Sequence, residues 1–472
     1  MIPHTASHGR PRVPPEKGLY AAGVLAVILA IYSGVTFASG GSRTDVVLPV
    51  AIVIALALTV MALTRFTLFV IVVLTVRAAL DATKLAGGAT DGGEQTGWSL
   101  LDPSTMLGVL FLLSCVAWLI VQGRRPAAER PHPALPVAAV TFLGASLLSL
   151  LGSRAPVVSV GEVSRIAAFV VMIFVVERLL ADEPGLRMPL LCAVFASAVL
   201  PVLVTAYQVT TGDGLMDLDG LLRPTGTFWH PNALGMFCFM ILIMSLALAW
   251  HVKGWGRAAL VVLAAGLGSA LLASAARGPW IACLAGLVVV GLLQDRRLIY
   301  GLVLVAGGVL AAVPSVLQRF SDLASTYTAG GLEANSLVWR FDHWIAALDL
   351  LPGNPVTGAG LGTTRLILYK EVHNDYLRAL VETGVVGLLA YLGLLAALFD
   401  LARRALRVTD PRKGAPAVSL SRGTAVGFAG CVVAFSVSAM ADNIMTAVVV
   451  MWYLAVFAGL AQRIVVAGKE TP

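Results

Sequence analysis

The chain has 472 residues, of which 58% are hydrophobic and only 12% charged, and its net charge is +7. Soluble globular chains contain about 45–50% apolar and about 25% charged residues, so this composition excludes a soluble enzyme, a disordered chain and a disulfide scaffold. In a membrane protein an excess of positive charge is typical of basic cytoplasmic loops, and we therefore expect no nucleic-acid partner.

Apolar runs that can cross a lipid bilayer recur along the whole chain. A helix needs about 20 apolar residues to span the hydrocarbon, and roughly twelve to fourteen runs approach this length. In chain order they cover about residues 19–38, 46–64, 66–80, 104–122, 134–151, 160–180, 187–208, 232–252, 257–275, 279–293, 298–316, 385–402, 424–441 and 445–463. The sequence therefore predicts an all-α polytopic membrane protein, with residues 1–472 as a single transmembrane domain.

The basic residues predict which side of the membrane each loop faces. With both termini in the cytoplasm and the loops alternating, about 21 of the 33 lysines and arginines fall inside, as the positive-inside rule requires. Residues 317–372 then form a large external loop, and residues 403–422 a basic cytoplasmic linker. Within the external loop, apolar residues at helical spacing from Asn335 to Leu351 predict an amphipathic helix on the membrane surface.

Under this topology three helices present their N-termini at the outer surface, each with a basic or imidazole side chain. Arg223 precedes the first of them, Arg277 opens the second, and His373 precedes the third. A helix N-terminus offers free backbone N–H groups and a positive dipole end, and arginine adds a planar fork that matches phosphate oxygens. The further candidate binding residues at these starts and on the amphipathic helix are Asn232, Arg340, His343, Asn374 and Asp375.

Transfer of a glycan from a lipid-linked pyrophosphate is a reaction that such a set of side chains could catalyse. Fixed arginines and helix N-termini can stabilise the negative charge that develops on the leaving pyrophosphate, in place of a metal. A histidine can accept the proton of the attacking hydroxyl. A single displacement would invert the anomeric configuration. The reaction that the sequence predicts therefore needs neither a metal nor a cofactor.

Four stretches of the chain resemble the bacterial O-antigen ligase and polymerase superfamily. They are Arg223–Gly235, Ser274–Ala282, Arg340–Gly360 and His373–Gly387. The resemblance covers about residues 190–400, and its last stretch is the most specific. The sequence departs from the usual pattern of this superfamily in two ways. Trp229-His230 takes the place of a small polar pair, and fourteen predicted spans exceed the usual twelve.

The resemblance implies a C-type glycosyltransferase fold in the bacterial cytoplasmic (inner) membrane, with the active site on its outer face. It further implies a polyprenyl-pyrophosphate glycan donor of the undecaprenyl type and a glycan or glycolipid acceptor, as in lipopolysaccharide biosynthesis. Carried over by position, Arg223 and Arg277 would hold the pyrophosphate, His373 would be the base and Arg340 would support them. The spacing from His373 to Gly384 is similar to that of ligases.

Three alternatives remain open. The first is a polysaccharide polymerase of the same superfamily. The second is a metal-dependent C-type transferase that uses a polyprenyl monophosphate sugar, with Asp45 or the Asp217-Leu-Asp219 pair as metal ligands. The third is a transporter of lipid-linked glycans, but transporters place charges in cavities within the membrane, whereas the external charges here lie at the predicted outer rim.

Overall fold

The computed structural model describes residues 43–81, 103–123, 133–218, 220–312, 336–414, 416 and 418–470. The chain divides into two units, Met1–Phe69 and Val70–Pro472. The first contains the apolar helix α2 (Arg43–Thr64), and α3 (Phe66–Leu80) begins in it. The run predicted at 19–38 lies outside the described residues.

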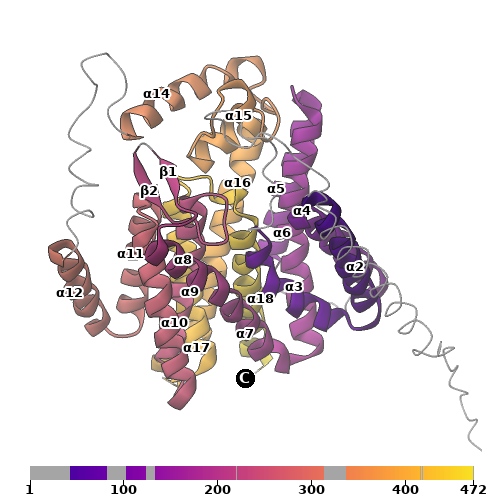
Figure 1. Cartoon of the computed structure of the whole chain (residues 1–472). Helices are drawn as coiled ribbons and strands as arrows, with labels where there is room; N and C mark the ends of the chain where they lie inside the picture. The colour runs from indigo at the N-terminus through magenta and orange to yellow at the C-terminus, as the bar shows by residue number, and fades with distance from the viewer. Residues whose placement is uncertain are drawn as a thin grey trace, which may run out of the picture. The chain divides into compact units, whose positions relative to one another are not determined.

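The second unit is built mainly of helices (Figure 1). Its helices are α4 (Pro103–Gln122), α5 (Ala134–Leu148), α6 (Pro156–Asp182), α7 (Arg187–Ser197), α8 (Val199–Thr211), α9 (Pro231–Ala249), α10 (Gly254–Ala273), α11 (Arg277–Leu293), α12 (Arg297–Ala312), α14 (Ser336–Leu348), α15 (Thr364–Ile367), α16 (Asp375–Val408), α17 (Leu420–Ser438) and α18 (Val448–Glu470). Strands β1 (Met216–Leu218) and β2 (Leu221–Arg223) pair antiparallel as a hairpin before α9.

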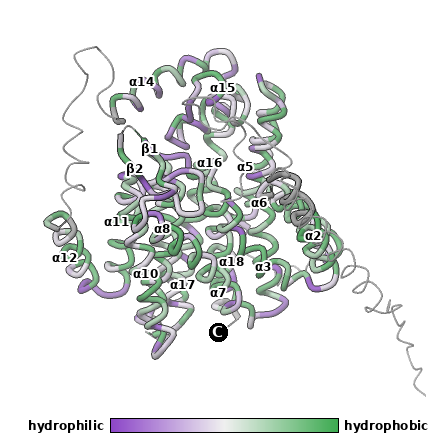
Figure 2. The backbone as a smooth tube through the Cα atoms, viewed as in Figure 1, coloured by the Kyte–Doolittle hydropathy of each residue, from purple (hydrophilic) through white to green (hydrophobic). Residues whose placement is uncertain are grey.

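Eight stretches within the described residues are long and apolar enough to cross a membrane. This confirms the prediction of an all-α polytopic membrane protein. The run predicted at 187–208 forms two successive helices, α7 and α8. Apolar residues cover most of the helix surfaces, whereas hydrophilic residues gather around α15 and the start of α16 (Figure 2).

Helices α9, α11 and α17 pack closely because small residues line their contacts. Helix α9 is apolar all round, and 89% of it is buried inside the protein. A Cβ atom on Gly286 of α11 would lie 2.8 Å from the Gly430 carbonyl oxygen of α17. Such close approach of backbones is how membrane helices gain packing energy where lipid supplies no hydrophobic driving force. It also brings the first turns of α9 and α11 next to each other.

Helix α16 is interrupted at Gly384, where φ is 68° and ψ is −172°. This is a backbone conformation that essentially only glycine adopts. The interruption exposes backbone groups that the preceding loop satisfies: Gly360 N donates to Glu382 O at 2.9 Å, and Val385 N donates to Pro355 O at 2.9 Å. A Cβ atom on Gly384 would overlap the Val356 carbonyl. The polar first turns of α16, predicted to precede its apolar run, are therefore held by the 355–360 loop.

The predicted amphipathic helix is present as α14 and is followed by a 3-10 turn over Leu351–Gly353. One of its faces packs on the start of α16: Ala347 and Val372 are fully buried together, and Trp344 Nε1 donates to Val372 O at 2.8 Å. Phe341 and Ile345 of the same helix are exposed. Helix α14 therefore covers the segment that leads into His373.

Candidate active site

The structure brings together the starts of α9 and α11. Arg223, at the end of β2, is buried, and its Nε donates to Ser274 O at 2.7 Å in the turn before α11. Its Nη2 donates to Asn232 Oδ1 at 3.1 Å in the first turn of α9. Two of the candidate residues, Arg223 and Asn232, are therefore in direct contact. Arg223 also links the hairpin to the starts of both helices.

Asp442 joins this group from the loop between α17 and α18. Its Oδ1 accepts from Asn232 Nδ2 at 3.0 Å, and its other carboxylate oxygen lies against Gly278 in the first turn of α11. Burial raises the pKa of Asp442 to about 6, although Arg340, Asn232 and Arg223 all oppose this shift. Sequence reasoning missed this residue; the only local signal is an Asp-Asn pair between two apolar runs.

Arg277 is the first residue of α11, as predicted, and its side chain is half-buried. Two residues earlier, Ala275 has φ of 50°, in the left-handed region that β-carbon contacts disfavour. The turn is held by Trp280, whose Nε1 donates to Leu271 O at 2.7 Å. Backbone strain of this kind is typical of functional sites, where the surrounding structure stabilises it.

His230 is the N-cap of α9 and was not among the predicted site residues. Its Nδ1 accepts from Asn232 N at 3.0 Å, so this nitrogen has no proton. Burial, followed by the positive charge of Arg223, lowers the pKa of His230 to about 4. A neutral His230 therefore fixes the first turn of α9 at neutral pH.

His373 lies just before α16 and also has left-handed backbone, with φ of 53°. Burial, followed by the charges of Arg340, His230, His343 and Lys370, lowers its pKa to about 3. Its Nδ1 is buried and has no hydrogen-bond partner within the described part of the chain. His373 is therefore a neutral imidazole at neutral pH, and it shares one electrostatic environment with His230 at the start of α9.

Helix α14 supplies a basic and aromatic cluster next to His373. The Trp339 ring meets the His373 ring edge-on, with 5.6 Å between centroids, and stacks on His343 at 4.6 Å. The Lys370 ammonium lies 4.9 Å from the centre of the Trp339 ring. Burial lowers the pKa of His343, whose Nε2 lies 3.1 Å from Lys370 O. Arg340 and His343 therefore belong to the surroundings of His373, where their charges lower its pKa.

Asn374 and Asp375 have contacts within the protein. Asn374 caps α16, with its Oδ1 accepting from Leu377 N at 3.0 Å. Asp375 is fully buried; its Oδ2 accepts from Met445 N at 2.9 Å, and its backbone N donates to Ala439 O at 2.8 Å. These bonds fix the start of α16 against the loop that contains Asp442. A direct role for either residue in binding substrate stays a prediction.

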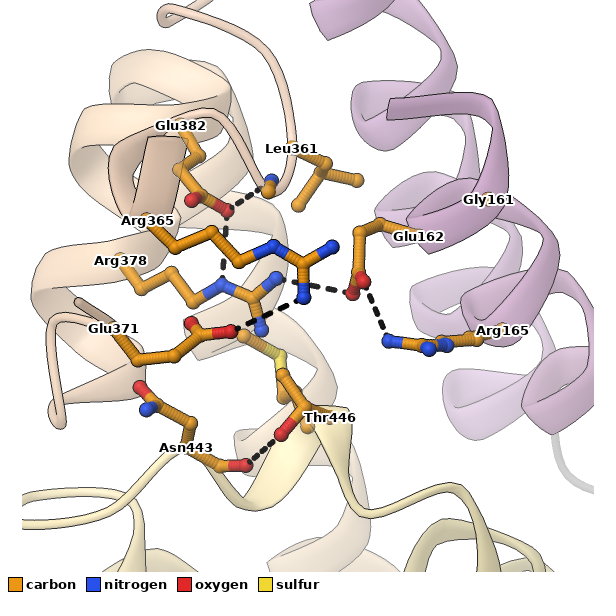
Figure 3. A network of polar contacts seen from close by, with 12 residues as sticks. Gly161, Glu162, Arg165, Leu361, Arg365, Glu371, Arg378, Glu382, Asn443 and Thr446 are labelled. Atoms are coloured by element: carbon orange, nitrogen blue, oxygen red, sulfur yellow. Dashed lines mark hydrogen bonds and ion pairs between the residues drawn. The ribbon is translucent and has the colours of Figure 1, made fainter. Parts of the chain in front are cut away.

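A buried ion network joins α6 to α16 (Figure 3). Arg378 is 2% exposed; its Nε lies 2.9 Å from Glu382 Oε2 and its Nη2 lies 3.1 Å from Glu162 Oε2. Arg165 pairs with Glu162, and Arg365 Nη1 lies 3.7 Å from Glu371 Oε1. Burial raises the pKa of Glu371 to about 7.

This network accounts for three of the cations that the predicted topology places outside, because Arg165, Arg365 and Arg378 each contact a carboxylate. Sequence reasoning did not find it. The Arg378–Glu382 pair at i,i+4 spacing was a visible signal, but its partner Glu162 lies 216 residues away in the chain.

The metal-dependent alternative names Asp45 or the Asp217-Leu-Asp219 pair. Asp217 is exposed in β1, and its Oδ1 accepts from Gly220 N at 2.9 Å, as is usual in a turn. Asp219 lies outside the described residues, and Asp45 belongs to α2 of the first unit. Within the described ranges, no three histidine, cysteine or acidic residues are grouped as a metal site would need.

The fold and this cluster define a polytopic membrane protein with a cationic site where several helix N-termini meet. Residues 258–392 match the family model described as O-Antigen ligase. This match supports the resemblance to the O-antigen ligase and polymerase superfamily that the motifs predicted, and the matched segment contains Arg277, Arg340 and His373. Arg223 and Asp442 lie outside the matched segment. Comparison with curated proteins gave no match.

Proposed function

We propose that this protein transfers a glycan from a polyprenyl-pyrophosphate donor to an acceptor hydroxyl, in the manner of an O-antigen ligase. The family match supports glycosyl transfer of the ligase or polymerase type in a membrane. The observation that favours this reaction is the contact of Arg223 with Asn232 and with the turn before α11, together with a neutral His373 in the same electrostatic environment.

In this mechanism, Arg223 and Arg277 bind the donor pyrophosphate together with the positive dipole ends at the starts of α9 and α11. Their charge stabilises the pyrophosphate as the anomeric C–O bond breaks, because the donors are fixed before the reaction begins. His373 takes the proton from the acceptor hydroxyl as that oxygen attacks the anomeric carbon on the opposite side. The product is a glycan of inverted configuration, with polyprenyl pyrophosphate as the leaving group.

The proposal is tested by reconstituting the protein in vesicles with a polyprenyl-pyrophosphate glycan and candidate acceptors. We expect one added block per acceptor, and undiminished transfer when EDTA is present. A ladder of products would indicate the polymerase, whose acceptor is another lipid-linked glycan. A strict need for a divalent cation would contradict the mechanism and favour the monophosphate-sugar transferase.

Arg277→Ala is expected to lower transfer by about 10²–10³-fold, because it removes a charge aimed at the leaving group. The measurement is the single-turnover rate in the same vesicles, with circular dichroism to establish that the helices are intact. Arg296→Ala is the matched control: Arg296 is exposed and follows the opposite end of α11. Equal rates for the two variants would refute the assignment of Arg277.

A further inference from the structure

A cavity lies at the opposite end of the helices that form the candidate site. It has a volume of about 700 Å³ and lies between the ends of α11 and α16 and the start of α17. Arg277 and His373 mark the N-terminal ends of α11 and α16, whereas the cavity is lined by Leu293 and Arg407 near their C-terminal ends. This cavity is therefore distinct from the site for the donor and acceptor.

The walls of this cavity are apolar. Leu292 of α11 and Phe399 of α16 line it and are 60% and 42% exposed, and Leu406 and Val433 add further apolar surface. Helix α16, which contains Phe399, is long and apolar enough to cross a membrane, and α11, which contains Leu292, is a shorter apolar helix. An apolar chain that entered the cavity would therefore remain next to the bilayer hydrocarbon.

The cavity is also lined by four arginines: Arg403, Arg407, Arg412 and Arg422. Arg422 is fixed in place, because its guanidinium donates to Leu406 O at 3.2 Å and to Leu293 O at 3.1 Å. Arg403 pairs with Asp400 at 2.7 Å. Arg407 and Arg412 are exposed and form no ion pair with any residue that the structure describes. Asp410 also lines the cavity, so the lining is strongly positive.

We propose that this cavity binds an anionic membrane phospholipid. Its phosphodiester would contact Arg407 and Arg412, and an acyl chain would lie along Leu292 and Phe399. Arginine forks match phosphate oxygens, and basic pockets between the ends of membrane helices suit anionic headgroups. The volume lies within the range of about 300–1,000 Å³ that is usual for specific ligand sites. A bound lipid would link α11, α16 and α17, and would stabilise the folded protein.

The test measures lipid binding to the full-length purified protein in detergent by native mass spectrometry and thermal unfolding. The probes are phosphatidylglycerol and phosphatidylcholine with identical acyl chains. We expect phosphatidylglycerol to bind and to raise the unfolding temperature, and phosphatidylcholine to do neither. Equal binding of the two lipids would overturn the proposal, because it would show that the arginines do not select the anionic headgroup.

The paired substitution Arg407→Ala and Arg412→Ala is expected to weaken phosphatidylglycerol binding at least about tenfold, since charge-assisted hydrogen bonds are lost. The matched control replaces Arg257 and Arg296, which are exposed and do not line the cavity. Equal affinity of the two double variants would overturn the proposal. Binding of soluble glycerophosphate as tight as that of the whole lipid would also do so, because it would indicate a free phosphate site.

A further measurement applies to the unmodified protein, in case the paired variant does not fold. Binding of phosphatidylglycerol must weaken as salt is raised to about 0.5 M, because the exposed arginines are screened. Affinity that stays constant over this range would contradict the proposal. These readouts do not use glycan transfer, so they are independent of the proposed reaction.

Discussion

Replacing His373 by asparagine is expected to lower glycan transfer by about 10²–10⁴-fold, the usual contribution of a general base. Asparagine tolerates the left-handed backbone that His373 adopts, so this change removes the base and keeps the conformation. His373→Gly relieves the strain completely and is the matched control for a conformational role. Full activity of either variant would show that the imidazole is not the base.

The pH dependence of transfer gives a second readout for His373. Its pKa is lowered from 6.5 to about 3, so the ring gains a proton only as the pH falls far below neutral. We therefore expect the transfer that depends on His373 to stay constant from about pH 8 to about pH 5. Loss of activity centred near pH 6.5 would indicate a ring that is charged and solvated, contrary to the structure.

Arg378→Met is expected to destabilise the protein by about 3–5 kcal/mol, because it leaves buried carboxylates without their partner. Glu382 is fully buried and Glu162 nearly so, and both contact Arg378. Arg404→Met is the matched control, since Arg404 forms an ion pair at the same spacing on α16 with a side chain that is 36% exposed. An exposed pair contributes only about 0–1 kcal/mol. The measurement is the unfolding midpoint in detergent micelles.

Neutralising the two carboxylates should restore part of this stability. Adding Glu162→Gln and Glu382→Gln to the Arg378→Met variant removes the uncompensated charges, although Glu382 also accepts from Gly362 N at 2.8 Å. A loss of stability for Arg378→Met no larger than that for Arg404→Met would show that the network does not hold α6 and α16 together.

Much of the candidate site follows from local sequence. The starts of α9 and α11 follow from Pro231 and Pro279, because proline fits the first turn of a helix. The start of α16 follows from the polar residues at His373 and Asn374, and the structure shows Asn374 as the N-cap. Helix α14 was predicted from apolar residues at helical spacing, which is also a local pattern. The run predicted at 187–208 lies within one stretch long enough to cross a membrane, Pro184–Thr211, which is interrupted only at Ala198 between α7 and α8.

The sequence by itself determined the class of this protein, because apolar runs long enough to span a bilayer need no tertiary contact to be recognised. It also determined where cations meet helix starts. Only the tertiary structure decided which of these cations are neutralised, since the partner of Arg378 lies on another helix. It alone placed Asp442 beside Asn232, 210 residues away, because contacts at such separation depend on how the helices pack.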